Sequence, residues 1–407
     1  MTPETQTALR ERLAAVLESD ARLLVEMRRH LHAHPERSGQ ETATTAYIGQ
    51  HLHDIGLSPK RLDVGTGLVC DIAIGDVGPH SPVVALRADI DALAMSDEKS
   101  VGYRSQVDGV AHACGHDVHT TAVLGAARAL VAVARTSDVA GTVRLVFEPA
   151  EESVPGGAVD VIREGWLDGV SAIFGVHCDP KVDVGKVGCR VGPITSASDM
   201  VEVRLRGPGG HTARPERTVD LVDVLGTLVT ELQPAIDALT SSPADLRLVF
   251  GAVHAGDAAN VIPSYGSLRG TLRTRDHDVW LHAPAVFEKA LASVLEGSMV
   301  EFDVDHRRGV PPVVNDEAAT ALVESAARAV LGEDAVLPTE QSLGGDSFAW
   351  YLERIPGSYT RLGVHDPRWT GLRLDLHAST FDVDERAIGH GALLLATVAL
   401  DALATTR

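Results

Sequence analysis

Residues 83–91, VVALRADID, form a short apolar run that ends in two aspartates, and residues 142–152, TVRLVFEPAEE, form another that ends in two glutamates. A third run, residues 172–176, ends at His177. Runs of about four to eight apolar residues are typical of buried strands, and the Ala-rich spacing of Thr120–Val133 is typical of a helix. Strands that alternate with helices predict an α/β fold with a mostly parallel sheet and helices on both of its faces. We expect Asp117 to cap the Thr120–Val133 helix.

A second pattern begins after Pro193. The order of predicted elements there is strand, helix, strand, strand, helix, strand, over residues 200–205, 219–239, 246–253, 265–273, 279–295 and 300–305. This is the split βαβ order of ferredoxin-like α+β domains. We therefore predict a catalytic domain in two parts, residues 1–193 and 309–407, with an inserted lid and dimerisation domain at residues 194–308. A chain of 407 residues also exceeds the roughly 250 to 300 residues at which single cores stop growing.

Composition excludes several classes of partner. The chain has 36 basic and 56 acidic residues, a formal net charge of -20, and only 4% aromatic residues. This charge repels nucleic acids and anionic membranes, so a small-molecule substrate remains. The N-terminus has no signal-peptide pattern, and we see no apolar stretch near the ~20 residues that span a bilayer. We expect a cytoplasmic protein with no membrane partner.

One segment, His112-Ala-Cys114-Gly-His116-Asp117-Val-His119, holds three imidazoles, a thiol and a carboxylate. Thiolate and imidazole are ligands for zinc and other later transition metals. The alternative is that this segment is only the polar, capped start of a helix and that its histidines occur there by chance. The triplet His30, His32 and His34 also invites a metal interpretation, but on a helix these side chains splay over different faces, so we expect them to shape the helix end near Pro35.

Two adjacent carboxylates follow the second strand. Glu151 and Glu152 repel each other unless a cation lies beside them, and one as metal ligand with the other as base is a sensible division. A solvated acidic loop is the alternative, but His177 and the Asp89/Asp91 pair also stand at predicted strand ends. Alone, His377 is more typical of a structural histidine. The turns around His211 and Asn260 could stabilise an oxyanion or bind a carboxylate, and spacing does not decide this.

Taken together, these segments resemble the M20 peptidase group of metal-dependent amidohydrolases, in its branch of N-acyl-amino-acid, hippurate and auxin-conjugate hydrolases. The resemblance is nearly full length. It rests on residues 29–36, 87–93, 112–119, 148–152, 175–177, 209–211, 260–263 and 376–377.

The resemblance implies a site and a mechanism. It implies two divalent metal ions per subunit, of a kind (Zn, Mn, Co or Ni) that the sequence does not fix, held by Cys114, His116, Glu152, His177 and His377. It implies that Glu151 is the general base, that Asp91 orients a ligand, and that His211 and Asn260 of the lid stabilise the tetrahedral oxyanion. In relatives the histidine often comes from a partner subunit, which implies a homodimer through the lid. The implied reaction is cleavage of the amide bond of an N-acyl amino acid or a related small amide conjugate.

The chain departs from this pattern in two places. Where relatives commonly have Glu-Asp-Phe it has Asp346-Ser347-Phe348, and residues 212–216, TARPE, replace a turn of small residues with a final histidine. Both departures put the preferred acyl group and amino acid in doubt. A metallo-dipeptidase or aminopeptidase-like hydrolase of the same fold is the first alternative. A cysteine hydrolase built on Cys114 would leave Glu151, Glu152 and the distant histidines unused, and a non-catalytic metal-containing binding protein would not need the base.

Overall fold

The computed structural model describes residues 3–241 and 245–405, which form two compact units. Unit 1 comprises residues 1–194, 314–340 and 347–407, and unit 2 comprises residues 195–313 and 341–346. Unit 2 thus starts one residue after the predicted boundary (195 against 194) and ends five residues after it (313 against 308). It also takes in residues 341–346, because Ser196 N donates to Gly344 O and Ser196 Oγ to Ser342 O.

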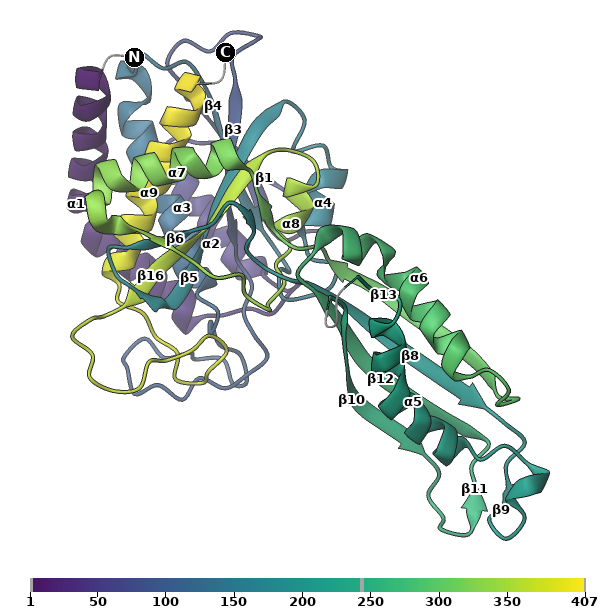
Figure 1. The fold of residues 1–407 in the computed structure, drawn as a ribbon. Coiled ribbons are helices and arrows are strands. Elements are labelled where there is room, and N and C mark those ends of the chain that lie inside the picture. The colour runs from purple at the N-terminus through teal and green to yellow at the C-terminus, as the bar shows by residue number, and fades with distance from the viewer. Residues whose placement is uncertain (1–2, 242–244, 406–407) are drawn as a thin grey trace. The chain divides into compact units, whose positions relative to one another are not determined.

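Unit 1 is built on an eight-stranded sheet with the order β1-β2-β4-β3-β5-β16-β6-β15 (Figure 1). Its central pairs, β4 with β3, β3 with β5 and β5 with β16, are parallel, as is β6 with β15, whereas β1 with β2, β2 with β4 and β16 with β6 are antiparallel. The strands are β1 (Lys60–Arg61), β2 (Leu68–Ile74), β3 (Val83–Asp89), β4 (Gly141–Glu148), β5 (Val170–Asp183), β6 (Val187–Cys189), β15 (Val336–Pro338) and β16 (Gly357–His365). A short pair, β7 (Gly192–Pro193) with β14 (Val314–Asn315), stands outside this sheet. The predicted α/β class with a largely parallel sheet is confirmed.

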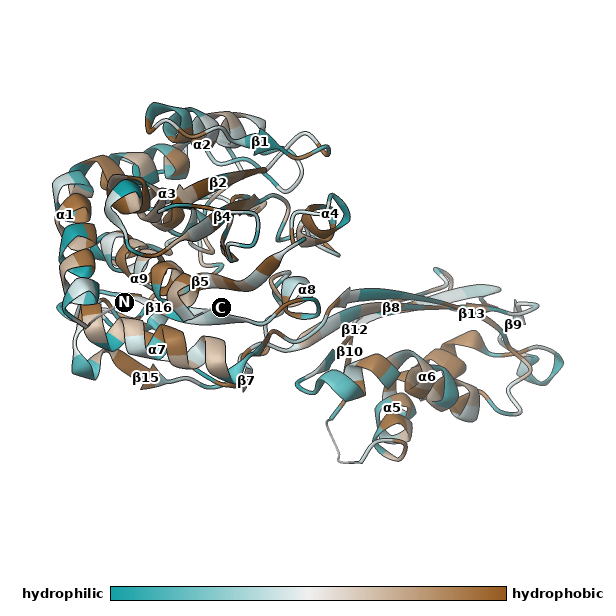
Figure 2. Ribbon diagram, turned by 90° about the horizontal axis from the view of Figure 1, so that it is seen from above, coloured by the Kyte–Doolittle hydropathy of each residue, from teal (hydrophilic) through white to brown (hydrophobic). Residues whose placement is uncertain are grey.

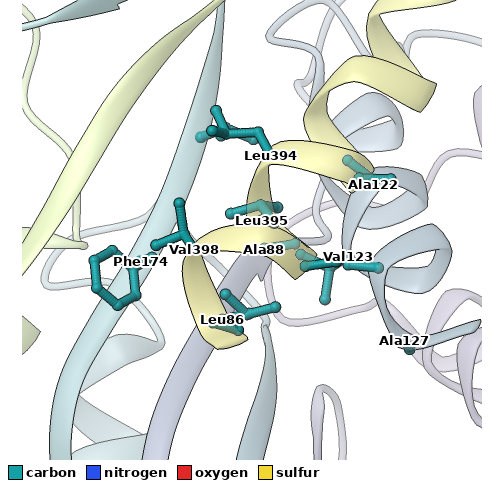
Figure 3. Packing of buried hydrophobic residues seen from close by; sticks show 14 of the residues in the cluster. Leu86, Ala88, Ala122, Val123, Ala127, Phe174, Leu394, Leu395 and Val398 are labelled. Atoms are coloured by element: carbon teal, nitrogen blue, oxygen red, sulfur yellow. The ribbon is translucent and has the colours of Figure 1, made fainter. Parts of the chain in front are cut away.

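Two apolar helices cover one face of this sheet. Figure 3 shows Val123 of α3 and Leu395 and Val398 of α9 in the buried cluster that contains Leu86 of β3. Arg87 points to the opposite face, where Tyr359 of β16 stacks on Phe348 just before α8. The helices of unit 1 are α1 (Pro3–Ala33), α2 (Thr42–Asp54), α3 (His116–Val133), α4 (Ala158–Arg163), α7 (Glu317–Leu331), α8 (Ala349–Leu352) and α9 (Arg386–Thr405).

Residues His116–Thr136 and Arg386–Thr405 are long and apolar enough to cross a membrane by length and composition. Neither is an uninterrupted apolar run, since charged residues such as Arg128 and Asp401 stand within them. In each helix 78% of the most apolar 18-residue window is buried inside the protein, and the core helix of a soluble protein can be equally long and apolar.

The start of α3 differs from its prediction. The N-cap is Gly115, with φ 93°, and it makes no side-chain capping hydrogen bond. Asp117 lies inside the first turn, where its carboxylate accepts hydrogen bonds from Arg28 Nε and pairs with His32 Nδ1, each at 2.7 Å. Asp117 therefore ties α3 to α1 instead of capping α3.

Unit 2 has the strand order β10-β12-β8-β13, with every neighbouring pair antiparallel. This is the order that a ferredoxin-like βαββαβ chain produces. Figure 2 shows hydrophobic residues along α5 and α6, and both helices contribute to the core of this unit. Its elements are β8 (Ala197–Arg206), β9 (Gly210–His211), α5 (Leu221–Asp237), β10 (Arg247–Ala255), β11 (Val261–Ile262), β12 (Tyr265–Thr274), α6 (His277–Val294) and β13 (Glu301–Val310).

One buried carboxylate in unit 2 yields a test of its stability. Asp199 Oδ1 accepts hydrogen bonds from Trp280 Nε1 and Gly309 N, each at 2.9 Å, and Oδ2 pairs with His306 Nε2 at 2.8 Å. Although burial by itself raises the pKa of Asp199, the hydrogen bond with His306 and its other donors lower it below the ordinary value. Stability from this carboxylate is therefore present above the unfolded pKa of about 3.9 and is lost as the pH falls through the folded pKa.

We expect Asp199→Asn to destabilise unit 2 by about 2 kcal/mol at pH 7, because the amide places a donor where Oδ2 accepts. Hydrogen exchange in peptides from β8 and β13 measures the change. Glu202→Gln on the same strand is the matched control, since its ion pair with Arg204 is partly exposed and contributes little. Equal protection in both variants would contradict the prediction.

Candidate metal centre

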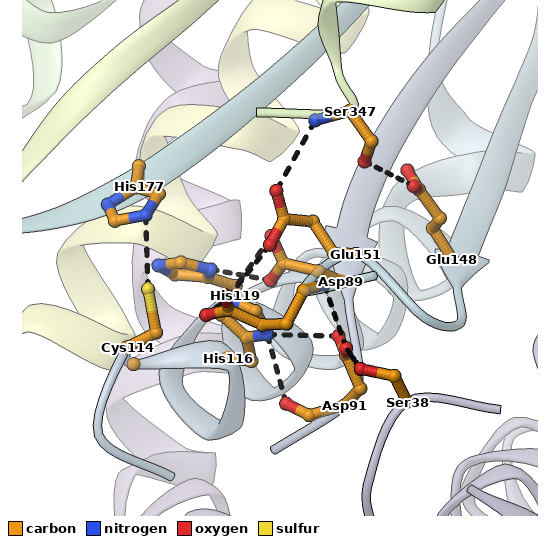
Figure 4. Close-up of polar contacts among 12 residues, drawn as sticks. Ser38, Asp89, Asp91, Cys114, His116, His119, Glu148, Glu151, His177 and Ser347 are labelled. Atoms are coloured by element: carbon orange, nitrogen blue, oxygen red, sulfur yellow. Dashed lines mark hydrogen bonds and ion pairs between the residues drawn. The ribbon is translucent and has the colours of Figure 1, made fainter. Parts of the chain in front are cut away.

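The five side chains predicted as metal ligands all lie in unit 1 and come together in space. Cys114, His116 and His177 form one group of potential ligand atoms within 4.8 Å of one another, and Cys114, Glu152 and His377 form a second. Cys114 belongs to both. Its Sγ lies 3.5 Å from His177 Nε2, as Figure 4 shows, and Glu152 Oε1 lies 3.4 Å from His377 Nε2.

The unpaired polar atoms of this cluster fit a cation. Among the described residues, His116 Nε2 and Glu152 Oε1 are buried without a hydrogen-bond partner, and they lie 3.9 Å apart. Buried polar atoms are seldom left unpaired, because the desolvation is not offset. The donors are sulfur, nitrogen and carboxylate oxygen, a set that suits zinc and neighbouring divalent metals. The residues present therefore fit divalent metal ions.

The backbone around the cluster adopts conformations that hold these side chains in place. His377 has φ 61°, unusual for a residue with a side chain, and its N–H donates to Ala113 O at 2.8 Å. This bond joins the loop of His377 directly to the loop of Cys114. At Gly115 a Cβ would lie 2.7 Å from Cys178 Sγ, so glycine is required where the loop turns into α3.

Asp91 contacts two of the predicted ligands. Its carbonyl and Oδ1 lie 2.9 and 3.3 Å from His116 Nδ1, and its Oδ2 accepts from Glu152 N at 3.0 Å. Ser38 Oγ donates to the same Oδ2 at 2.6 Å. With Nδ1 donating to Asp91, Nε2 of His116 presents its lone pair to the cluster. This is the geometry expected of a residue that orients a ligand.

A third group, Asp89, His116 and His119, also meets the distance criterion for a metal site. However, both ring nitrogens of His119 are engaged. Nε2 accepts from Cys178 N at 2.8 Å, so Nδ1 carries the proton and donates to Asp89 Oδ1 at 2.7 Å. His119 therefore holds Asp89 in place and has no lone pair left for a metal.

The electrostatics of the cluster weigh against a nucleophilic thiol. Burial raises the pKa of Cys114 and lowers the pKa of His177. Although burial also acts to lower the pKa of His116, the negative charge of Asp89 raises it above its ordinary value. A cysteine nucleophile needs a lowered pKa. Cys114 is therefore poorly suited to that role without a bound cation.

Glu151 lies beside this cluster, on the side of Ser347. Its Oε2 is 3.9 Å from His116 Nε2, and its Oε1 accepts a hydrogen bond from Ser347 N at 3.3 Å (Figure 4). The preceding Ala150 has φ 55°, a strained conformation at the turn that separates β4 from the two glutamates. Glu151 and Glu152 thus share His116 as a neighbour and form with it a fourth candidate group for a metal, but Glu151 bonds to Ser347 and Glu152 pairs with His377.

His211 and Asn260 lie in unit 2, where the structure brings them next to each other. In the β9–β11 ladder His211 pairs with Val261, and Thr212 N donates to Asn260 O at 3.3 Å. Both side chains are exposed. The spacing of the two turns in the sequence does not indicate that they form one small sheet.

Three residues of the site neighbourhood escaped sequence analysis as functional candidates. His32 is buried between Asp117 and Asp97, so it does more than shape the helix end near Pro35. Arg87 was quoted only as part of the family pattern, and Ser347 only as a departure from it. That departure was the one signal that could have singled out Ser347 as a residue with a role of its own.

Comparisons with known proteins agree with this geometry. The profile of Peptidase family M20/M25/M40 matches residues 85–401. "N-acetyl-L-cysteine deacetylase" of Bacillus subtilis is 37% identical over 365 residues, which cover 90% of this chain and 84% of that protein. The crystal structure of the Bacillus subtilis YXEP protein, described as a dinuclear metal binding peptidase from the M20 family, has a TM-score of 0.83 and 31% identity, and the match covers 96% of this chain and 99% of that one.

Another relative is longer. "Putative glutamate--cysteine ligase 2-3" of Rhodococcus jostii is 46% identical over 379 residues, which are 93% of this chain and 46% of that protein. The chain thus spans about half the length of this relative.

Proposed function

Since the chain belongs to peptidase family M20/M25/M40, we propose that it is a metal-dependent amidohydrolase that cleaves the amide bond of N-acyl amino acids through a water molecule activated by Glu151. The observation that carries this proposal is the division between the adjacent glutamates. Both glutamates lie 3.9 Å from His116 Nε2 and form a candidate metal group with it, but Glu152 also groups with Cys114 and His377, whereas Glu151 accepts a hydrogen bond from Ser347 N.

The ligands that we propose are Cys114, His116, Glu152, His177 and His377, and Cys114 would serve two ions because it belongs to both groups. Bound divalent ions would polarise the scissile carbonyl and lower the pKa of water. The identity of the metal, among Zn, Mn, Co and Ni, stays open.

Glu151 does the proton transfer in this mechanism. Its carboxylate takes a proton from the attacking water as the C–O bond forms, and then gives that proton to the nitrogen as the C–N bond breaks. Asp91 keeps His116 and Glu152 oriented throughout. We propose that His211 and Asn260 donate hydrogen bonds to the tetrahedral oxyanion, and their neighbouring positions on the β9–β11 ladder support joint action. His211→Ala should lower kcat, and unchanged turnover would remove it from the mechanism.

The deacetylase relative supports an N-acyl amino acid as substrate class, and the solved relative described as a peptidase supports an unblocked dipeptide as the alternative. The test is release of free amino acid from a panel of N-acyl amino acids and dipeptides. We expect hydrolysis of the N-acyl compounds to stop on chelation and to return with one divalent metal. Activity that survives complete chelation would refute the proposal, and turnover confined to dipeptides would favour the alternative.

We further propose a homodimer formed through unit 2. Strand β10 is an edge of its sheet, and its Val249 and Val253 are exposed, as are Val222 and Val229 on α5, which packs against β10. An uncovered apolar edge strand is a natural pairing surface. Sedimentation should give a dimer for the wild type and a monomer for Val253→Lys, and a monomeric wild type would refute the proposal.

A cytoplasmic location is also proposed, supported by four cysteines that are all free. Cell fractionation tests it.

A further inference from the structure

Next to Glu151 lies a buried polar cluster that the proposed mechanism does not use. It consists of Arg87, Glu148, Ser347 and Tyr351, and we call it the Arg87 cluster. All four residues are buried, with an exposed fraction of at most 1%. A buried polar cluster beside the proposed base requires a functional explanation.

Arg87 is the only cation of the cluster. Its Nε lies 2.7 Å from Glu148 Oε2 and its Nη1 lies 2.6 Å from Asp89 Oδ2. Its Nη2 donates to Ser347 Oγ at 3.1 Å. The guanidinium thus contacts both the Asp89 and the Glu148 carboxylates, and Asp89 also accepts a hydrogen bond from His119. Glu148 accepts further hydrogen bonds from neutral donors.

Those donors surround the Glu148 carboxylate. Oε1 accepts from Ser347 Oγ at 2.5 Å and from Ala158 N at 2.8 Å, while Oε2 accepts from Tyr351 OH at 2.9 Å in addition to Arg87. Four donors on one buried carboxylate stabilise its ionised form. The site at residue 148 is therefore built for a single negative charge.

Ser347 connects this carboxylate to Glu151. Its side chain donates to Glu148, and its backbone N–H donates to Glu151 Oε1, as Figure 4 shows. The serine has little room to move, because a Cβ on Gly156 would lie 2.5 Å from Ser347 Cβ. The position of the N–H that holds Glu151 therefore depends on the bond between Ser347 Oγ and Glu148.

An acidic side chain at residue 347 of this chain would face the Glu148 carboxylate and would remove its hydroxyl donor. Two carboxylates in direct contact at a buried place repel each other. Serine at 347 and glutamate at 148 are thus matched.

We propose that the Arg87 cluster positions Glu151 for catalysis, and that either residue 148 or residue 347 can carry a carboxylate side chain, but not both. The positioning role rests on the proposed function of Glu151 as the base. The rule of one carboxylate rests on the contacts alone. Ser347 and Glu148 are positioning residues here, since neither contacts the reacting atoms.

The test compares four variants: Ser347→Ala, Ser347→Asp, Glu148→Gln and the double variant S347D/E148Q. We expect Ser347→Ala to lower kcat about tenfold to a hundredfold, because misplacing a catalytic group has effects of this size, with KM and metal content unchanged. Ser347→Asp should lower both kcat and Tm, and Glu148→Gln should lower both because Arg87 loses a counter-ion. The double variant should recover kcat and Tm toward wild type, which a merely structural role for either residue does not predict.

Ser358→Ala is the matched control, since Ser358 is a buried serine whose hydroxyl contacts Thr320 instead of the cluster. Wild-type kcat in Ser347→Ala would overturn the positioning role. Additive losses of Tm in the double variant would overturn the rule of one carboxylate. The Tm comparison needs no substrate, so it gives its answer even if the wild type hydrolyses no N-acyl amino acid, an outcome that would refute the proposed function separately.

Discussion

Glu151→Gln is expected to lower kcat by about 10³-fold on an N-acyl amino acid while the protein keeps its metal, since a positioned general base contributes about 10²- to 10⁴-fold. The amide keeps the shape of the side chain and can still accept from Ser347 N, but it cannot take a proton. Glu151 lies 3.9 Å from His116 Nε2 but is not one of the five proposed ligands, so the substitution should leave those five side chains in place. Elemental analysis and steady-state kinetics on the same preparation measure both quantities.

Glu152→Gln is the matched control, one residue away on the same turn. Its Oε1 is a buried atom without a hydrogen-bond partner among the described residues, placed between His116 and His377. We therefore expect this variant to lose metal together with activity. Equal metal loss in both variants would contradict the division of roles between the two glutamates.

The fold of both units could be predicted largely from sequence because hydrophobic spacing is a local signal. The helix predicted at Thr120–Val133 lies within α3, and the order of elements in unit 2 follows directly from this signal. Strand β2 was not predicted. It pairs antiparallel with β4, and nothing local in its sequence indicates which neighbour it will have. Likewise, Asp117 satisfies every local rule for a capping residue, but the distant Arg28 and His32 determine where its carboxylate points.

The candidate site, too, could be predicted only in part from the sequence. The residues that would bind metal stand at strand ends, where the topology of a parallel sheet gathers them, so their clustering could be expected. The contacts that hold them are long-range. Ser347 meets Glu148 across a separation of 199 residues, and Arg28 meets Glu385 across 357. Such pairs leave no trace in spacing or composition, and His377, alone in sequence, reaches the site through long-range contacts with Ala113 O and Glu152.

Arg28→Met is the second substitution with a large expected effect, because Arg28 is the centre of a buried ionic cluster behind the Cys114–His116 loop. Its guanidinium lies 2.7 Å from Asp117, 3.1 Å from Asp382 and 3.3 Å from Glu385, and its side chain is 1% exposed. Although burial by itself lowers the pKa of Arg28, these carboxylates raise it, so the cation is fixed in the folded state. Methionine fills a similar volume but removes the cation that pairs with the buried Asp117, and breaking a buried ion pair in this way destabilises a protein by about 3–5 kcal/mol.

The neighbouring Arg29 provides a matched control for this experiment. Arg29 pairs with the same Glu385 at 2.6 Å, yet its side chain is 48% exposed, so Arg29→Met should change stability by less than about 1 kcal/mol. Hydrogen exchange in peptides from α1 and α3 measures the local free energy of opening in both variants. Because Asp117 directly follows His116, we also expect Arg28→Met to bind metal more weakly, as read by competition with a chelator. Similar losses of stability in the two variants would mean that the effect comes from Glu385, which both arginines contact, and not from the buried Asp117.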